Sequence, residues 1–499
     1  MSIKLSHKTI FKMKTSRRDF IKTAGMAGGI LATGGLSACN SCGGTSASEA
    51  APGIWDISTN KGKQIFNMSG YAAPKIDVIK IGYIGVGGRG MAAVKRMALL
   101  EGVEIVALSD LKIERIDEAK AYLKKLGMTE PKGYADGSQD LWKEMCDKED
   151  LDLIYIATPR DLHPSMCVYG MKSGSHVATE IPAARTLDEC WSLVETSEKT
   201  KKHCSMIENC VYDFWELLIL NMARQGFFGE IVHVDAGYVS NQINTNLNKE
   251  LEWRTREFIN RDGNIYPTHG LGPACQVLDI NRGDRMDFMV SVSSADFTMS
   301  KEIEKRAAKD DYYKQFIGQW KLGNMNTSII KTVNGKTIKL QYNVSNPRPG
   351  TRIHWVVGTE GIAKKQPMPS RISHGGSGWV SAEELKALEE KFTPPIVQIA
   401  GEMAKKVGGH GGMDFLMQWR LVDCLRNGLP LDMDCYDAAA WSSIVPLSEW
   451  CVANNSVPVR IPDFTRGAYK TNEPLDIAMT KGGGSTKIKT TIKFNDDYF

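Results

Sequence analysis

Short apolar segments alternate with helix-like segments along the chain from about residue 75 onwards. Apolar runs of strand length between helices are typical of a parallel sheet, because its strands are buried on both faces. This pattern predicts a doubly wound α/β domain that extends to about residue 208. The predicted strands cover residues 77–84, 103–108, 153–157, 176–179 and 203–207, and the predicted helices cover 91–100, 164–173 and 187–200.

After residue 230 the pattern changes to β-rich runs with apolar–polar alternation, which is typical of strands with one solvated face. An Asn-Gly pair at 334–335 separates two of these runs and predicts a tight hairpin. We therefore expect a second, α+β domain with an open, mostly antiparallel sheet. Its predicted strands are 231–239, 288–292, 326–333, 336–344 and 352–357, and its closing helices are 413–427 and 436–453. We expect surface insertions at 298–315 and at 363–410, the second of which contains a helix at 382–391.

A glycine-rich segment joins the first predicted strand to its helix. Gly85, Gly87 and Gly90 form a G-x-G-x-x-G pattern, and Asp110 follows the second strand twenty residues after Gly90. In a Rossmann fold such glycines permit a tight turn, close approach of a pyrophosphate and close helix–strand packing, and the acid binds the adenosine ribose. The carboxylate of Asp110 would also repel a 2′-phosphate, so the sequence predicts a site for NAD rather than NADP.

Polar residues follow four of the five predicted parallel strands, at the edge where open α/β sheets bind ligands. They are Asp110, the segment 160–163, Glu180 and the pair at 208–209. We expect them to surround the cofactor. For His163 and Glu180 taken singly, helix capping or hydrogen bonding within a loop is the alternative interpretation.

The positive charge of the chain lies in its leader. Residues 1–38 hold seven Lys or Arg and one acid, and removing them changes a net charge of +4 into −2, from 55 basic and 57 acidic residues. Charge therefore gives no reason to expect a nucleic acid partner. The stretch from Ser16 to Lys22 resembles the twin-arginine export signal, and the Gly/Ala-rich segment after it is too short and too weakly apolar to span a bilayer.

The four residues from Leu36 to Cys39 resemble the lipobox of bacterial lipoproteins, in which the cysteine becomes the lipidated first residue. The sequence thus predicts an exported periplasmic or cell-surface lipoprotein held to a membrane through Cys39; an ordinary cleaved signal is the alternative. The expected division is 1–38 signal, 39–74 tether, 75–208 NAD-binding domain, 209–480 substrate-binding domain and 481–499 C-terminal tail.

Cysteine usage agrees with folding before export, in a reducing compartment. Nine cysteines remain besides Cys39 and Cys42, an odd number without paired spacing, so we expect free thiols. The Cys and His residues form no cluster with zinc spacing, and we expect no metal.

The layout resembles the family of glucose-fructose oxidoreductase and inositol dehydrogenase. Its dehydrogenases usually carry E-K-P after the fourth strand, and the lysine contacts substrate and assists proton transfer. Here Ile181 stands in the place of that lysine, and its side chain can neither donate, accept nor titrate. The interpretation as a dehydrogenase is weakened at this position.

The chain is also similar, over about residues 78–470, to glycoside hydrolase family 109, the NAD-dependent α-N-acetylgalactosaminidases. The most specific matches are Tyr-Pro-Thr-His-Gly at 266–270 and Gly-His-Gly-Gly-Met-Asp at 409–414. The resemblance places NAD contacts at Gly88, Arg89, Asp110, Arg160, Asp161, Leu162, His163, Glu180, Ile181 and Asn209. It places sugar contacts at Tyr238, Arg254, Tyr266, Pro267, Thr268 and His269. A family tyrosine that follows an Arg-Pro pair is replaced by Gly350, which leaves the exact sugar open.

The chemistry that this resemblance implies is redox-neutral. NAD⁺ takes hydride from sugar C3, the acidified C2 proton is removed, the C1 leaving group departs, water adds, and the hydride returns; such glycosidases need no carboxylate pair at the scissile bond. His269 is the candidate to deprotonate the C3 hydroxyl, because histidine titrates near neutral pH. Tyr266 is expected to assist C2 proton transfer or to orient the sugar, and Arg254 to hold its polar groups.

Several interpretations stay open at this point. At single residues, the alternatives are a buried structural role for His269, plain packing for Tyr212 and Tyr238, and helix capping for His410. For the whole chain, the alternatives are a sugar oxidoreductase and a non-catalytic sugar-binding lipoprotein. The oligomeric state, including a homo-oligomer, also stays open.

Overall fold

The structure is a computed structural model that describes residues 53–60 and 62–489, and these residues belong to one compact unit. The predicted export signal and the predicted lipidation site at Cys39 lie outside the described residues. Among the helices of the described residues, none is long and apolar enough to cross a membrane.

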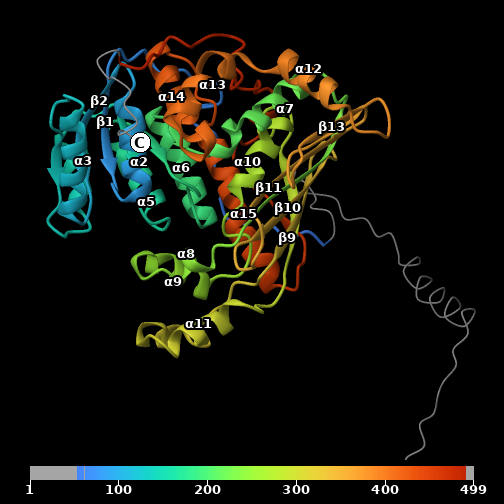
Figure 1. Cartoon of the computed structure of the whole chain (residues 1–499), viewed down its shortest axis with the longest axis horizontal. Helices are drawn as coiled ribbons and strands as arrows, with labels where there is room; N and C mark the ends of the chain where they lie inside the picture. Colours follow the sequence, from blue (N-terminus) through green and yellow to red (C-terminus); the bar gives the residue numbers. More distant parts are fainter. Residues whose placement is uncertain (1–52, 61, 490–499) are drawn as a thin grey trace, which may run out of the picture. The chain divides into compact units, whose positions relative to one another are not determined.

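The first sheet is parallel and six-stranded, in the order β3-β2-β1-β4-β5-β6, with helices on both sides (Figure 1). This confirms the predicted doubly wound Rossmann domain. Its strands are β1 (Ile79–Ile84), β2 (Val103–Ser109), β3 (Lys132–Tyr134), β4 (Leu153–Ile156), β5 (His176–Thr179) and β6 (Cys204–Met206). Its helices are α2 (Gly88–Ala98), α3 (Ile113–Lys125), α4 (Leu141–Lys148), α5 (His163–Lys172) and α6 (Leu187–Thr200).

The central strands form the core of this domain because they are mostly apolar. Every residue of β4 and β5 is buried, as expected for parallel strands covered on both faces. Helix α6 begins at a capping box in which Thr186 and Glu189 satisfy each other's backbone N–H groups. The sequence pattern missed α3 and α4, whose apolar faces bury only three residues each.

The second sheet has eight strands in the order β13-β12-β11-β7-β10-β9-β8-β14. Within this second sheet, only the β7–β10 pair is parallel among the pairings of its described strands, which confirms an open, mostly antiparallel sheet. The predicted hairpin joins β9 and β10. The strands are β7 (Ile231–Val239), β8 (Met286–Ser293), β9 (Asn326–Thr332), β10 (Thr337–Asn343), β11 (Thr351–Gly358), β12 (Gly361–Lys364), β13 (Arg371–His374) and β14 (Val459–Arg460).

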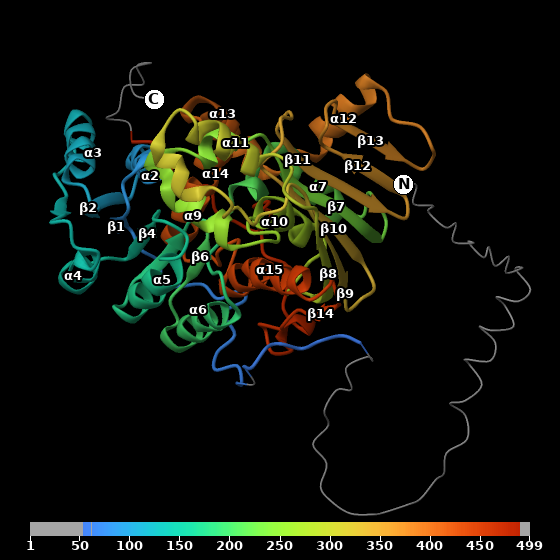
Figure 2. The same cartoon turned by 90° about the horizontal axis from the view of Figure 1, so that it is seen from below.

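Helices α10 (Thr268–Val277) and α15 (Cys435–Ala453) lie between the two sheets (Figures 1 and 2). Helix α14 (Met413–Asn427) returns to the first domain, where Arg96 Nε donates to Gln418 Oε1 at 2.7 Å. The Gln418 amide in turn donates to Tyr155 Oη at 2.9 Å. Part of the predicted substrate-binding segment is thus built into the wall of the Rossmann domain.

A second, smaller core lies beneath residues 243–260, which we call the cap. The cap holds α8 (Ile243–Asn246), the 3₁₀ turn η2 (Lys249–Leu251) and α9 (Glu252–Asn260). Its apolar side packs on α11 (Met299–Ala307) and the 3₁₀ turn η3 (Asp311–Phe316), and Figure 1 shows α8, α9 and α11 gathered together. The residues predicted as a surface insertion at 298–315 therefore contribute a buried face, which corrects that expectation.

The second predicted insertion, 363–410, is also more integrated than expected. It contains β13, part of β12, α12 (Ala382–Phe392) and α13 (Pro395–Val407). Helix α13 buries Ile396, Ala400 and Ala404 in the main core, so only part of this segment is a surface feature.

The described parts of the predicted tether and tail both contact the body. Trp55 pairs with Val459 as an isolated bridge, and Met68 is buried in the main core. At the other end, Ile488 pairs with Leu100 of the Rossmann domain. The described residues of 55–73 and of 481–489 thus make contacts with the fold.

The remaining short elements carry or adjoin several of the predicted site residues. Helix α7 (Phe214–Arg224) follows the 3₁₀ turn η1 (Asn209–Tyr212), which begins directly after Glu208. The 3₁₀ turns η4 (His410–Gly412) and η5 (Ala468–Lys470) precede α14 and the C-terminal segment.

Candidate active site

A cleft of about 810 Å³ lies at the carboxyl edge of the parallel strands and continues between the second sheet and the cap. This is the edge at which open α/β sheets bind ligands. All but three of the predicted site residues line it. Those that do are Gly85, Gly87, Gly88, Arg89, Asp110, Arg160, Asp161, Leu162, His163, Glu180, Ile181, Asn209, Tyr238, Arg254, Tyr266 and His269.

The glycine-rich turn has the close contacts that its sequence predicts. Gly85 adopts φ +87°, in the left-handed region that disfavours side chains. A Cβ at Gly90 would lie 1.9 Å from the Gly85 carbonyl oxygen, so no larger residue fits there. Gly90 does not line the cleft; it lets the helix approach the strand, while the N-terminus of α2 faces the space for a pyrophosphate.

Asp110 holds the glycine-rich turn in addition to facing the cleft. Its Oδ2 accepts the Val86 N–H at 2.9 Å and its Oδ1 accepts the Lys112 N–H at 3.0 Å. Arg115 Nη1 lies 3.4 Å from Oδ1 and also lines the cleft. The sequence alone did not indicate Arg115 as a neighbour of the predicted ribose ligand.

A buried carboxylate, Asp414, joins several predicted cofactor residues. It accepts hydrogen bonds from Arg89 Nη1 at 2.7 Å, from Asn209 Nδ2 at 2.6 Å and from His410 Nδ1 at 2.8 Å. Arg89 Nε also donates to Glu180 Oε1 at 2.7 Å. Burial opposes ionisation, but His410 and the Arg89 guanidinium hold the pKa of Asp414 far below its ordinary value. Asp414 ends the Gly-His-Gly-Gly-Met-Asp stretch, yet the sequence did not identify its role.

His163 has the structural role that was the alternative at this position, although it also lines the cleft. Its Nδ1 lies 2.9 Å from the Pro182 carbonyl oxygen and its Nε2 lies 2.9 Å from the Thr158 carbonyl oxygen. Burial lowers the pKa of this imidazole. His163 therefore ties together the loops that follow β4 and β5.

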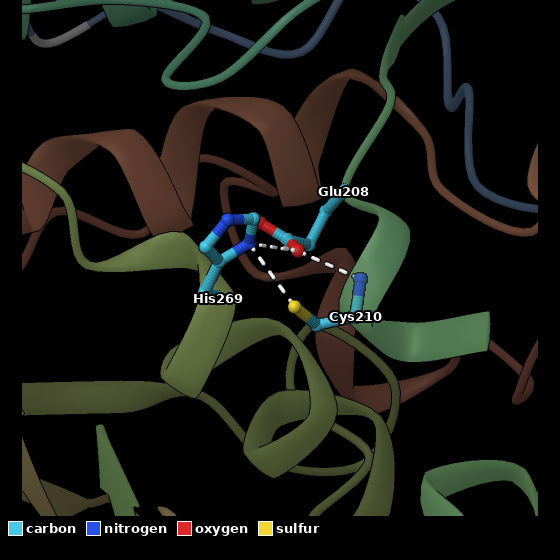
Figure 3. Close-up of side chains that lie close together, drawn as sticks. All are labelled: Glu208, Cys210 and His269. Carbon is cyan, nitrogen blue, oxygen red and sulfur yellow. Dashed lines mark hydrogen bonds and ion pairs between the residues drawn. The ribbon is translucent and has the colours of Figure 1, made fainter. Parts of the chain in front are cut away.

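His269 lies on the first turn of α10, next to Glu208 and Cys210 (Figure 3). Its Nδ1 is 2.7 Å from Glu208 Oε1 and 3.1 Å from Cys210 Sγ. Glu208 is fully buried, and although burial opposes ionisation, the His269 ring lowers the net pKa of its carboxyl below the ordinary value. A carboxylate at Nδ1 selects the tautomer with the proton there, which leaves Nε2 as the proton acceptor of the ring.

A metal ion could also bind between Glu208, Cys210 and His269, because their ligand atoms lie within 4.8 Å of one another. Their separations, however, are hydrogen-bond distances. Glu208 Oε1 additionally accepts the Cys210 N–H at 2.9 Å, and Arg352 Nη1 lies 3.6 Å from Cys210 Sγ. A divalent cation would displace protons from this network and lie beside the Arg352 cation, so a hydrogen-bonded dyad is the better description.

Two tyrosines enclose His269 on the cleft side. The rings of Tyr238 and Tyr266 lie 5.0 and 4.9 Å from the His269 ring, centroid to centroid. Burial raises the pKa of both phenols, so both stay protonated and serve as hydrogen-bond donors at neutral pH. Gln242 Nε2 donates to Tyr238 Oη at 2.7 Å, which leaves the hydroxyl proton of Tyr238 for another acceptor.

Arg254 enters the cleft from the cap. Its guanidinium stacks over the Trp253 ring at 4.7 Å, and among the described residues no carboxylate lies within ion-pair distance. Its Nε is buried without a hydrogen-bond partner in the same part of the chain. Burial and the nearby Arg160 lower the pKa of this group. A ligand in the cleft would supply the acceptors that Arg254 lacks.

Three predicted residues lie behind the site rather than in it. Besides Gly90, these are Pro267, which precedes α10, and Thr268, which is fully buried in its first turn. Tyr212 is a core residue whose Oη donates to Asp432 Oδ2 at 2.9 Å, in agreement with the packing alternative.

The sequence also missed a group of cleft residues in and next to the cap. Gln242 directly precedes the cap, and five residues belong to it: Asn246, Glu250, Leu251, Trp253 and Phe258.

Comparisons with known protein families agree with this division. Residues 79–208 match the family model described as "Oxidoreductase family, NAD-binding Rossmann fold". Residues 212–471 match the model "Glycosyl hydrolase 109, C-terminal domain". The first match, with the glycine-rich turn described above, indicates an NAD-type cofactor.

Two curated relatives from Bacteroides fragilis are similar to most of this chain. It is 45% identical over 415 residues to glycosyl hydrolase family 109 protein 1 of Bacteroides fragilis, covering 80% of this chain and 88% of that one. It is 45% identical over 410 residues to an alpha-N-acetylgalactosaminidase of the same species, covering 80% and 95%.

Two solved structures share the fold at low identity. A levoglucosan dehydrogenase in complex with NADH and L-sorbose is 16% identical with a TM-score of 0.58, covering 78% of this chain and all of that one. The scyllo-inositol dehydrogenase of Lactobacillus casei with NAD(H) and scyllo-inositol is 12% identical with a TM-score of 0.52, covering 77% and 99%. The family model and the relatives at 45% identity show that the site described above is that of a glycoside hydrolase, and that the chain belongs to glycoside hydrolase family 109.

Proposed function

We propose that this enzyme hydrolyses terminal α-N-acetylgalactosamine, or a closely related glycan sugar, in a redox-neutral cycle with retained NAD. The observation that carries the proposal is the Glu208–His269 dyad, which opens into the same cleft as the cofactor loops. The printed name of the Bacteroides fragilis relative supports the choice of sugar. The substitution of Gly350 for the expected tyrosine keeps a related sugar within the proposal.

The nicotinamide would supply the chemistry that the side chains lack, by taking up hydride from sugar C3 and later returning it. The glycine-rich turn, Asp110 and Asn209 would hold such a cofactor. Ile181 lines the cleft where dehydrogenases of this fold carry a lysine, so this position offers no group for proton transfer.

His269 acts as the general base for the C3 hydroxyl. Its Nε2 accepts the hydroxyl proton, and the Glu208 carboxylate at Nδ1 stabilises the imidazolium that forms. The same proton returns to the sugar oxygen when the cycle closes. Glu208 thus fixes both the tautomer and the orientation of the base.

Tyr266, Tyr238 and Arg254 orient the sugar. Both phenols stay protonated, so they donate hydrogen bonds to sugar oxygens rather than remove protons. This narrows the role expected for Tyr266 to orientation and proton donation. Arg254 brings a planar guanidinium whose buried Nε has no hydrogen-bond partner among the described residues, and this group suits a carbonyl or a pair of hydroxyls.

The same proposal includes export as a folded lipoprotein, supported by the Ser16–Lys22 stretch and by Cys39. A cofactor that is regenerated in every turnover suits this route, because no supply of free NAD is then needed outside the cytosol. Radiolabelled palmitate should be incorporated at Cys39. If a Cys39→Ala variant still takes up label, this part of the proposal is wrong.

The test of the activity uses purified enzyme without added cofactor. It is incubated with p-nitrophenyl α-N-acetylgalactosaminide, while nitrophenol and absorbance at 340 nm are followed together. Nitrophenol release over many turnovers without net NADH supports the proposal. NADH in proportion to enzyme without nitrophenol would indicate a sugar oxidoreductase instead, and neither signal on several sugars would indicate a binding protein.

A further inference from the structure

The cap is joined to the Rossmann domain by charges that are almost fully buried. Glu257, on α9, and Arg160, in the loop after β4, both have side chains only 5% exposed. Arg160 Nη1 donates to Glu257 Oε2 at 2.7 Å. An ion pair buried to this degree is strongly oriented, because each partner is costly to leave alone.

Glu257 contacts more than one cofactor loop. Its Oε1 lies 3.9 Å from Arg185 Nε, in the loop after β5, and 3.9 Å from Arg261 Nη1, at the end of the cap. Arg261 is held in turn by an ion pair with Glu449 of α15. One carboxylate of the cap therefore gathers three cations, two of which come from loops at the carboxyl edge of the parallel sheet.

Arg160 is fixed by aromatic rings as well as by charge. Its guanidinium lies 4.5 Å from the Tyr266 ring and 5.3 Å from the Trp253 ring, centroid distances typical of cation–π contacts. Burial opposes its charge, but the Glu257 carboxylate raises the net pKa of Arg160 above its ordinary value. Trp253 belongs to the cap, so both the stacking and the ion pair join the same two parts.

The cleft runs between the parts that these contacts join. Arg160, Asp161 and Leu162 line it from the Rossmann side, and Leu251, Trp253 and Arg254 line it from the cap. A cofactor in the cleft therefore has to pass between two walls that Glu257 holds together. Glu252 of the cap makes a contrast, because it pairs with Arg256 of its own helix and accepts a hydrogen bond from Tyr312 of η3, and it contacts neither of the two loops.

From this arrangement we infer that Glu257 is a positioning residue that latches the cap over the bound NAD and slows its release. The inference rests on the proposed function in one respect, that the retained cofactor is NAD. Glu257 acts through Arg160 and Arg185 and has no part in proton transfer. The latch gives a physical basis for an enzyme that regenerates one NAD and keeps it.

The experiment measures release of cofactor rather than activity. Wild type, Glu257→Gln and Glu252→Gln are loaded with radiolabelled NAD and diluted into excess unlabelled NAD, and protein-bound label is followed with time. Glu257→Gln should release label at least about tenfold faster than wild type, because loss of one buried charged partner acts mainly on dissociation. Glu252→Gln, the same substitution on the same helix, should release label at the wild-type rate.

Equal release from wild type and Glu257→Gln would overturn the latch, and so would faster release from both variants alike. A merely structural role would lower the melting temperature of the cofactor-free protein but leave the release rate unchanged well below the melting transition. If Glu257→Gln does not fold, Glu257→Asp, which keeps the charge but shortens its reach, decides the question by the same criteria. Wild type that holds no NAD would contradict the proposed function instead of the latch.

Discussion

At the scale of single residues, the account depends on a carboxylate that lies behind His269, the proposed general base. Glu208 directly precedes η1 and is placed by its own turn, since its side chain accepts the Cys210 N–H. Its partner His269 lies 61 residues further along the chain. The local sequence could indicate each residue but not the dyad, because only the packing of α10 beside η1 brings them together.

Replacing Glu208 by Gln should lower kcat by roughly 10²–10⁴-fold with little change in KM, because the amide removes the charge that stabilises the imidazolium but keeps the volume. Steady-state kinetics on a p-nitrophenyl glycoside measures this. The double variant with His269→Ala should be no worse than His269→Ala alone, since the two residues act as one unit. A Glu208→Gln enzyme with wild-type kcat would refute the dyad.

The glycine-rich turn offers a second test at this scale. A Cβ at Gly90 would lie 1.9 Å from a backbone oxygen, whereas one at Gly88 would meet no described atom within 4 Å. Gly90→Ala should therefore destabilise the fold by about 3 kcal/mol or more and abolish NAD binding, while Gly88→Ala should stay within about 0.5 kcal/mol of wild type. Urea unfolding and NAD content measure both. Similar stability of the two variants would contradict the close approach.

At the scale of elements, the long helices and strands agree with the sequence pattern, whereas the short helices of the cap were not predicted. The strand at 231–239 and the helices at 187–200 and 413–427 were predicted at their observed bounds, because their apolar residues follow a clear pattern. The helix at 187–200 also begins at a capping box. The cap helices are short and half-polar, and α9 buries only four residues. Their stability comes from packing on α11 and η3, which lie about fifty residues away in the sequence, and no local pattern reports such packing.

The small core under the cap should therefore control the sugar end of the cleft. Phe316 is almost completely buried there, against the same core as Phe258 of the cap. Phe316→Ala should cost about 3–5 kcal/mol locally and raise KM for the sugar, because the wall that carries Trp253 and Arg254 loses its support. The measurement is KM together with hydrogen exchange of residues 243–260. Unchanged exchange in the cap would show that this core does not hold it.

At the scale of the whole molecule, buried histidines link stability to pH, and three of them have strongly lowered pKa values. Burial lowers the pKa of His176 to about 3, of His203 to about 4 and of His354 to about 3. In the unfolded chain each would bind a proton near pH 6.5, so the unfolded state gains protons first as pH falls. The contribution of these histidines to the free energy of unfolding is thus fully present above about pH 6.5, and it declines towards pH 4 by about 1.4 kcal/mol per pH unit for each histidine.

Thermal unfolding between pH 7.5 and 4 checks this expectation. Tm should fall steadily below about pH 6.5. In a His354→Phe variant that folds, Tm should decrease less steeply with falling pH, because one of the three histidines no longer contributes. A Tm that stays constant down to pH 4.5 would contradict the burial of these rings as neutral groups.

The central claim is that this member of glycoside hydrolase family 109 cleaves the glycosidic bond by oxidation at C3 and elimination across C1 and C2. Hydrolysis in D₂O, followed by NMR of the released sugar, tests it most directly. The account predicts deuterium at C2 of the product and retention of the original hydrogen at C3, because the C2 proton exchanges with solvent while the hydride returns from the cofactor. A product with no deuterium on carbon would mean direct displacement at C1 and would contradict the account.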